Sequence, residues 1–417
     1  MEPISQFNMP QGLNVAILCH SDKCNGKRDT GSGPIEPLLS FFTASKARYI
    51  FLIEQPHPLP GISLDCTMEV YRDGALIATH VSTRYRWLYD LPADRAMRTY
   101  PSLKLRDTLA SRDLLAMIPR LYPDCGALDF LIGMESLNAL VGQAFRNRLG
   151  IRNLVYYTYD WAPYRYASRW MSALFAWLDK RACRRANACW NVTDLIAEAR
   201  RDILRYDMRK MAKQVVVHVG SEFRDSLVRP FGEKPERINV IFSGGHHFDN
   251  GVQFIPEIAR RVAAADPRVH FIITGEGSMT AGIKQEIAGY GLTNLTFTGF
   301  VSAEELDKLM CESLIGLAPY PATGMSTKAY GDVIKIRTYM ACGLVTVTTH
   351  VPPIAREVRK ENLGIVTEID AAEMADAILK LSADESLLRT CRENVIRKAK
   401  GHTWNAILTH AVSESLA

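Results

Sequence analysis

The sequence predicts an α/β protein with two doubly wound domains, each built around a mostly parallel sheet. Apolar, β-branched segments alternate with helical segments along both halves of the 417 residues. Glycines and polar residues repeatedly follow the predicted strands. A polar segment with two prolines, residues 223–237, interrupts the alternation near the middle. The composition, 47% hydrophobic and 23% charged, is that of a globular chain, and the length suits two domains of roughly 150–200 residues.

Residues 1–222 are expected to form the first domain. Asp73-Gly74 lies between two short apolar segments and favours a hairpin of residues 67–71 and 76–81. Residues 168–185 have the spacing of a long amphipathic helix. The remaining pattern predicts strands at 13–19, 49–53, 128–133, 154–158, 188–192 and 214–219, with helices at 35–43, 108–122 and 136–149.

After a linker at residues 223–237, residues 238–400 repeat the alternation and are expected to form the second domain. Residues 401–417 contain a final helix, with Trp404 near its start as an anchor. The strands predicted in this half are 238–243, 269–274, 295–298, 314–318, 344–349 and 365–367, separated by helices at 251–264, 279–290, 303–312, 333–342 and 371–381.

Residues 314–349 contain the clearest strand–loop–helix–strand unit. An apolar run stops at Pro319, a polar loop covers 320–332, and the following helix ends at Gly343. Ligands bind beyond the carboxyl ends of parallel strands, so we expect one at this loop. Lys335 lies in the first turn of the helix, where an ammonium and free backbone N–H groups are suited to holding a phosphate.

Residues 335–344, KIRTYMACGL, resemble the signature of retaining, family 4-like (group 1) glycosyltransferases with the GT-B fold. The resemblance implies two Rossmann-like domains facing a cleft, with the last helix crossing back to the first domain. It also implies that Lys335 contacts the diphosphate of a nucleotide-sugar donor. Two glutamates of the family are replaced: Thr338 stands where the ribose is contacted, and Tyr330 stands at the earlier carboxylate position.

Other turns of the second half resemble the glycine turns at the donor site of this family. Gly244 and Gly245 follow a strand, and without side chains they let backbone N–H groups approach a phosphate. A tight turn with no ligand explains the pair almost as well. The expected donor-binding residues are Gly244, Gly245, His246, Gly275, Glu276, Gly299, Tyr320, Asp332, Lys335 and Thr338.

Three ionisable residues of the first half, His20, Glu135 and Asp160, each follow a predicted strand and are the candidate catalytic residues. Asp160 lies where the resemblance implies a polar residue facing the reacting sugar. It would accept a hydrogen bond from an acceptor hydroxyl or stabilise positive charge at the anomeric carbon. Helix capping or an Asx turn is the structural alternative for the two acids. The acceptor side is expected to include Gly31, Gly33 and Tyr159.

Residues 161–213 combine basic and aromatic side chains, with twelve Lys or Arg against five Asp or Glu. An exposed helix of this kind is typical of contact with an anionic membrane surface, while a solvated face over a buried aromatic stripe is the alternative. No recognition motif for nucleic acid accompanies the segment. The nine cysteines form no CxxC pair and no signal peptide precedes the first strand, so we expect a cytoplasmic protein, peripheral at the inner membrane face where this segment binds.

The resemblance implies hexosyltransferase-like, retaining transfer from a UDP- or GDP-linked sugar to a glycan or lipid-linked acceptor in polysaccharide biosynthesis. Neither a cofactor nor a metal is expected. Two alternatives remain open. One is a nucleotide-sugar epimerase of the same fold. The other is a non-catalytic pseudo-glycosyltransferase subunit, which the replacements at Tyr330 and Thr338 suggest.

Overall fold

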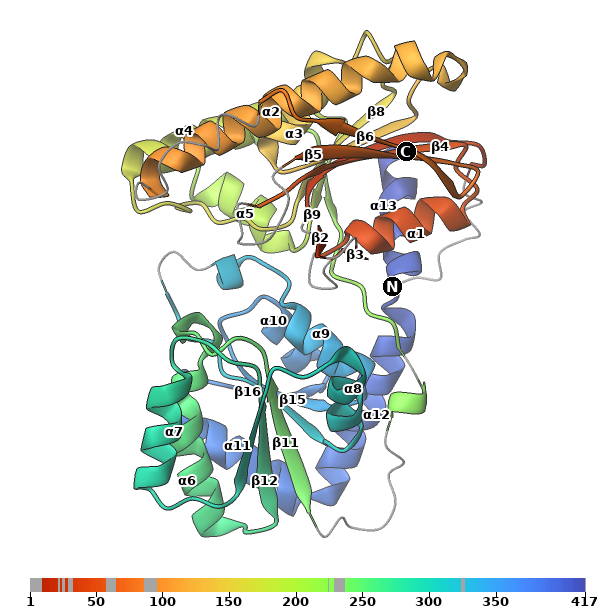
Figure 1. Ribbon diagram of the computed structural model, residues 1–417. Coiled ribbons are helices and arrows are strands. Elements are labelled where there is room, and N and C mark those ends of the chain that lie inside the picture. The colour runs from red at the N-terminus through yellow and green to blue at the C-terminus, as the bar shows by residue number, and fades with distance from the viewer. Residues whose placement is uncertain are drawn as a thin grey trace. The chain divides into compact units, whose positions relative to one another are not determined.

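The computed structural model describes residues 10–21, 23–24, 27–28, 33–57, 65–85, 96–223, 225–228, 237–323 and 327–416. The chain divides into two compact units (Figure 1). Unit 1 comprises Met1–His218 and Ile407–Ala417, and unit 2 comprises Val219–Ala406. Each unit has its own sheet, and the predicted α/β class is confirmed.

Unit 1 contains an eight-stranded sheet in the order β10-β9-β8-β7-β1-β4-β5-β6. The β4–β5 and β5–β6 pairs are antiparallel, and the other neighbours are parallel. Strand order reverses at β1, which lies between β4 and β7, so this is the topological switch point of the sheet. The strands are β1 Asn14–His20, β4 Tyr49–Gln55, β5 Cys66–Arg72, β6 Ala75–Ser82, β7 Phe130–Met134, β8 Asn153–Thr158, β9 Ala188–Asn191 and β10 Lys213–Val216.

The predicted hairpin is present as β5 and β6, and both of its turn residues have positive φ, 50° at Asp73 and 85° at Gly74. A small two-stranded sheet joins β2 Lys23–Cys24 to β3 Lys27–Arg28. In Figure 1, α2, α3 and α4 lie on one face of the large sheet and α1 lies on the other. The helices are α1 Ile35–Ala44, α2 Ala96–Leu121, α3 Ser136–Ala144, α4 Arg169–Arg185 and α5 Asp194–Asp202.

Unit 2 contains a six-stranded, fully parallel sheet in the order β13-β12-β11-β14-β15-β16. Its switch point lies between β11 and β14. Its strands are β11 Ile238–Ser243, β12 Val269–Thr274, β13 Leu295–Gly299, β14 Ile315–Ala318, β15 Val345–Thr349 and β16 Gly364–Thr367. Its helices are α6 Ile255–Ala265, α7 Thr280–Gly289, α8 Ala303–Cys311, α9 Ile334–Ala341, α10 Ile354–Lys360, α11 Ala371–Ala383 and α12 Glu385–Gly401.

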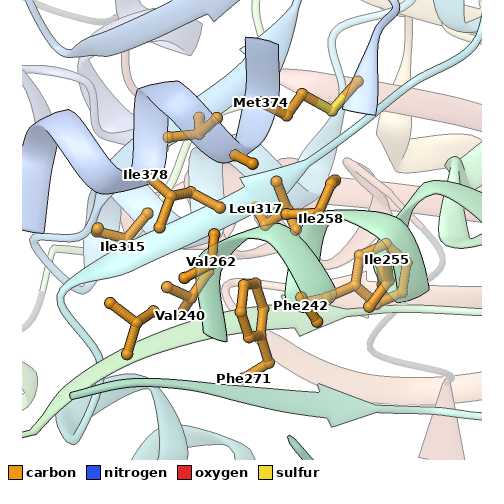
Figure 2. Packing of buried hydrophobic residues seen from close by; sticks show 14 of the residues in the cluster. Val240, Phe242, Ile255, Ile258, Val262, Phe271, Ile315, Leu317, Met374 and Ile378 are labelled. Carbon is orange, nitrogen blue, oxygen red and sulfur yellow. The ribbon is translucent and has the colours of Figure 1, made fainter. Parts of the chain in front are cut away.

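Two clusters of apolar side chains pack against the two faces of the unit 2 sheet. On one face, α6 and α11 pack Ile258, Val262 and Ile378 against strand residues such as Val240 and Leu317 (Figure 2). On the other face, residues of α9, α10 and α12 form a second cluster. Because central parallel strands are covered on both sides, they read in the sequence as continuous apolar runs, which is why this half was predictable.

The last helix, α13 Trp404–Leu416, belongs to unit 1 from Ile407 onward. Leu408, Ala411 and Val412 are buried, and the Trp190 indole N–H donates a 2.8 Å hydrogen bond to Ser415 Oγ. The chain therefore returns to unit 1 after completing unit 2, as the fold resemblance implied. No helix within the described ranges has the length and apolar character needed to cross a bilayer.

Candidate functional site

The candidate donor site lies at the carboxyl edge of the unit 2 sheet, at its switch point. Gly244 follows β11, Tyr320 follows β14, and Lys335 lies in the first turn of α9. The Lys335 ammonium is 3.8 Å from the centroid of the Phe242 ring and 5.3 Å from that of Tyr320. A Cβ at Gly244 would lie 3.5 Å from Lys335 Nζ. The structure thus places the predicted lysine next to the predicted glycine turn.

The Lys335 side chain is partly buried, and its ammonium nitrogen is fully buried. Its Nζ has no hydrogen-bond partner among the described residues. Burial, with a smaller effect from the Lys328 charge, lowers the pKa of Lys335 to about 7. An ammonium without a counter-ion is costly to bury, and an anion bound beside it would remove that cost. The arrangement is therefore suited to binding a phosphate.

The turns after β11, β12 and β13 are linked by backbone hydrogen bonds. The Gly244 N–H donates to the Thr274 carbonyl over 3.3 Å, and the Gly275 N–H donates to the Gly299 carbonyl over 2.8 Å. Gly275 has a φ of 100°, and a side chain there would overlap the Gly244 carbonyl. Gly275 is therefore needed for the close approach of its turn to the Gly244 turn, whether or not a ligand is present.

The two other predicted residues in these turns, His246 and Glu276, also have defined places. His246 is buried, and burial holds its pKa below the ordinary value, so the imidazole is mainly neutral at pH 7. Its Nδ1 is 2.9 Å from Thr280 Oγ1. The Glu276 carboxylate lies over Gly299, where a Cβ would be 3.1 Å from Oε1. Neither side chain therefore adds positive charge to the site at pH 7. Gly245, the next predicted residue, directly precedes His246 in the turn.

The side chains of Asp332 and Thr338 form hydrogen bonds within unit 2. The buried Asp332 carboxylate accepts hydrogen bonds from the Val219 N–H at 2.8 Å and from Arg337 Nε at 3.1 Å. Arg337 also pairs with Glu357 at 3.0 Å. The Thr338 hydroxyl donates to the Ile334 carbonyl of its own helix at 3.1 Å. These contacts account for both residues structurally, so their donor contacts stay predictions.

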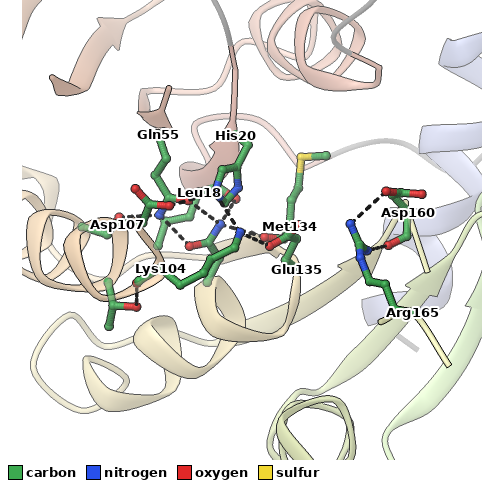
Figure 3. A network of polar contacts seen from close by, with 12 residues as sticks. Leu18, His20, Gln55, Lys104, Asp107, Met134, Glu135, Asp160 and Arg165 are labelled. Atoms are coloured by element: carbon green, nitrogen blue, oxygen red, sulfur yellow. Dashed lines mark hydrogen bonds and ion pairs between the residues drawn. The ribbon is translucent and has the colours of Figure 1, made fainter. Parts of the chain in front are cut away.

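A second group of polar residues lies at the switch point of unit 1 (Figure 3). His20 ends β1, Glu135 follows β7, and Lys104 of α2 lies between them. Lys104 Nζ is 2.6 Å from Glu135 Oε2 and 3.0 Å from His20 Nε2. His20 Nε2 is also 3.0 Å from Asp107 Oδ2. The structure thus joins two of the three candidate catalytic residues through a lysine that the sequence analysis did not identify.

Glu135 has a strained backbone. Its φ of 70° and ψ of 159° lie in a region that is occupied almost only by glycine. Burial acts to raise the pKa of Glu135, but the charges of Lys104, His20 and Arg165 outweigh it and lower the pKa to about 2. The side chain is therefore a carboxylate at neutral pH. Strain of this kind often occurs where a side chain is held for function.

Asp160, the third candidate, lies in the loop after β8. Arg165 binds its carboxylate at 2.9 Å and also contacts its backbone carbonyl (Figure 3). The neighbouring Tyr159 packs against Gly33, where a Cβ would lie 3.0 Å from the Tyr159 ring. These two acceptor-side residues are thus in contact, whereas Gly31 lies outside the described residues.

A pocket of about 440 Å³ opens beside Glu135, between α2 and α4. Its charged lining residues are Lys104, Glu135 and Arg165. The other lining residues are Leu105, Thr108, Ser136, Leu137, Tyr166, Trp170, Met171, Leu174, Phe175 and Leu178. The sequence analysis did not identify this pocket, because its walls come from three separate segments of the chain, residues 104–108, 135–137 and 165–178.

The C-terminal part of the chain is similar to a known family. Residues 237–384 match the sequence model of the family described as "Glycosyl transferases group 1". No curated protein matches the sequence. The family match covers the strands, turns and helix that hold Lys335, and it confirms the resemblance found in that region.

Solved structures resemble the whole chain. Sucrose-phosphate synthase from Thermosynechococcus elongatus has a TM-score of 0.65 at 16% identity, covering 97% of this chain and 99% of that one. The UDP-forming trehalose-phosphate synthase from Burkholderia xenovorans has a TM-score of 0.65 at 12% identity, with 97% and 98% covered. Anabaena HepE, solved with UDP, has a TM-score of 0.64 at 14% identity, with 97% and 99% covered. At these identities the likeness establishes the fold, which is GT-B.

Proposed function

We propose that this chain, whose residues 237–384 match the model of the group 1 glycosyltransferases, transfers a sugar from a nucleoside-diphosphate donor to a glycan or lipid-linked acceptor with retention of configuration. Unit 2 would bind the donor and unit 1 the acceptor. The observation that carries the proposal is the Lys335 ammonium, buried beside Gly244 and without a hydrogen-bond partner in the described chain.

The donor diphosphate would bind Lys335 and the backbone N–H groups of the Gly244–Gly245 turn. UDP is the first nucleotide to test, because Anabaena HepE was solved with it, and GDP is the second. No divalent metal is assigned a role, since the lysine and the N–H groups of the turn would contact the diphosphate directly. The leaving diphosphate oxygen would itself take the proton of the acceptor hydroxyl.

On the acceptor side, the ionised Glu135 would accept a hydrogen bond from an acceptor hydroxyl. Lys104 and His20 would hold Glu135 in place through the 2.6 Å and 3.0 Å contacts of the lysine. Asp160 would face the reacting sugar, oriented by Arg165. The exposed basic and aromatic residues of α4 would place unit 1 at an anionic membrane surface, with the protein on the cytoplasmic side.

Replacing Lys335 by alanine tests the donor site. We expect UDP binding, measured by calorimetry, to weaken by about 1.5–3 kcal/mol, the range for a hydrogen bond to a charged group. The control is Lys308→Ala, since Lys308 is exposed on α8 and pairs only with Glu304, at 3.7 Å, in the described chain. A panel of UDP, GDP, ADP and TDP sugars in a thermal-shift assay would first select the nucleotide.

Equal affinity of Lys335→Ala and the unchanged protein for the selected nucleotide would contradict the proposal. The alternatives give different results. An epimerase would convert the free sugar nucleotide with no acceptor present. A pseudo-glycosyltransferase would bind none of the nucleotides. This alternative is suggested by Tyr330 and Thr338, which replace the two carboxylates of the resembled family.

A further inference from the structure

We propose that the pocket beside Glu135 in unit 1 binds the hydrocarbon chain of an amphiphilic acceptor, so that the acceptor is lipid-linked. This inference rests on the proposed function and narrows it to one class of acceptor. The occupant would be a single alkyl or isoprenoid chain carrying a polar, anionic head.

The form of the pocket supports a chain as its occupant. Its volume of about 440 Å³ lies within the range of small-molecule sites. One wall consists of Trp170, Met171, Leu174, Phe175 and Leu178, on successive turns of α4. The opposite side is formed by residues of α2 and the start of α3. Against such apolar walls the hydroxyl groups of a sugar would lose hydrogen bonds to water, whereas a hydrocarbon chain gains free energy from each buried methylene.

The charged residues of the pocket are gathered where α2, α3 and the loop after β8 meet. Lys104, Glu135 and Arg165 all line the pocket, and the first two form a 2.6 Å ion pair. A chain lying along α4 would therefore end beside the carboxylate proposed to contact the acceptor hydroxyl. An amphiphile fits this order of apolar and polar surfaces better than a wholly apolar or a wholly polar ligand.

The outer surface of α4 indicates where the chain comes from. Trp170 is 64% exposed, Leu174 is 47% exposed and Trp177 is 56% exposed, and their spacing places them along one stripe of the helix. The exposed basic residues of α4 are Arg169, Arg181, Arg184 and Arg185, and its single acid, Asp179, is buried in an ion pair with Arg200. This charge complements an anionic lipid head, so the occupant is drawn from a lipid surface.

A chain-length series tests the inference on the full-length protein. We would measure binding of butyl, hexyl, octyl and decyl phosphate by calorimetry, each below its micelle-forming concentration. Affinity should rise by up to about fourfold per added methylene until the pocket is filled. Leu174→Glu places a charge at a partly exposed lining position and should abolish the dependence on chain length. Trp177→Glu, on the same exposed stripe but outside the pocket lining, should keep it.

UDP binding measured on the same samples separates the two proposals. If UDP binds but affinity is independent of chain length, the lipid inference fails and the proposed function stands. If both exposed-residue variants weaken decyl phosphate equally, the helix surface and not the pocket binds it, and the inference fails. Leu174→Glu could instead change the oligomeric state measured by sedimentation and leave alkyl phosphate binding unchanged. That result would assign the pocket to contact with a second copy of the protein, and the lipid inference would fail.

Discussion

The Lys335 ammonium makes donor binding dependent on pH. In the free protein the pKa of Lys335 is about 7, because the ammonium group is buried and Lys328 is close. A bound diphosphate favours the charged form, so above pH 7 binding must take up a proton. We expect UDP affinity to fall as the pH rises from 7 to 9. Calorimetry at pH 8 in two buffers of different ionisation enthalpy would measure the proton uptake.

The same pKa affects the stability of the ligand-free protein. The folded value lies below the roughly 10.4 of an unfolded chain, so between about pH 7 and pH 10 the unfolded state binds more protons. This lysine therefore makes the free energy of unfolding rise with pH across that window. Lys335→Met should remove this contribution and also the proton uptake on UDP binding. Unchanged proton uptake in the variant would show that another group titrates.

The backbone of Glu135 allows a test that separates strain from chemistry. Glu135→Gly and Glu135→Ala both remove the carboxylate and its 2.6 Å contact with Lys104. Only glycine adopts a φ of 70° with a ψ of 159° at little cost. We expect the glycine variant to be about 1–3 kcal/mol more stable than the alanine variant in urea unfolding, the reverse of the usual order.

Both Glu135 variants should lose transferase activity, because each lacks the group proposed to contact the acceptor. Their affinity for UDP, which is bound by unit 2, should be unchanged. If alanine were the more stable of the two, the strained conformation would be wrong. Full activity in both variants would instead remove Glu135 from the proposed acceptor site.

At the scale of the elements, the strands and most helices were predictable because each carries its own pattern. The central strands of unit 2 are continuous apolar runs, and α4 was expected at 168–185 and is found at Arg169–Arg185. The helix α2 was expected from 108 but begins at Ala96. Its first turns, which contain Lys104, have no regular apolar spacing, so local sequence gave no signal there.

The candidate sites were predictable to the extent that they depend on strand ends. Gly244 and Lys335 meet because both lie at the carboxyl edge of one sheet, which the strand pattern already required. The partners of Asp332 and Asp160 were not predictable, although Arg337 and Arg165 are each only five residues away. A carboxylate near a strand end is suited equally to a ligand and to a neighbouring arginine, and only side-chain geometry distinguishes the two.

At the scale of the whole molecule, each unit has separate hydrophobic clusters, and α13 contributes to unit 1 although it ends the chain. We therefore expect calorimetric unfolding to show two transitions. Leu408→Ala, in α13, should lower only the unit 1 transition, and Leu381→Ala, in α11, only the unit 2 transition. Both leucines are fully buried, so each substitution should cost about 2–5 kcal/mol.

UDP binding is an independent way to assign the two unfolding transitions to the two units. At 100 times its dissociation constant it should stabilise the unit that binds it by about 2.7 kcal/mol. If the donor site lies in unit 2, the transition lowered by Leu381→Ala is the one that UDP raises, and the transition lowered by Leu408→Ala stays in place. A single transition shifted equally by both substitutions would show that the units unfold together. UDP raising the Leu408 transition alone would place the nucleotide in unit 1 and overturn the donor assignment.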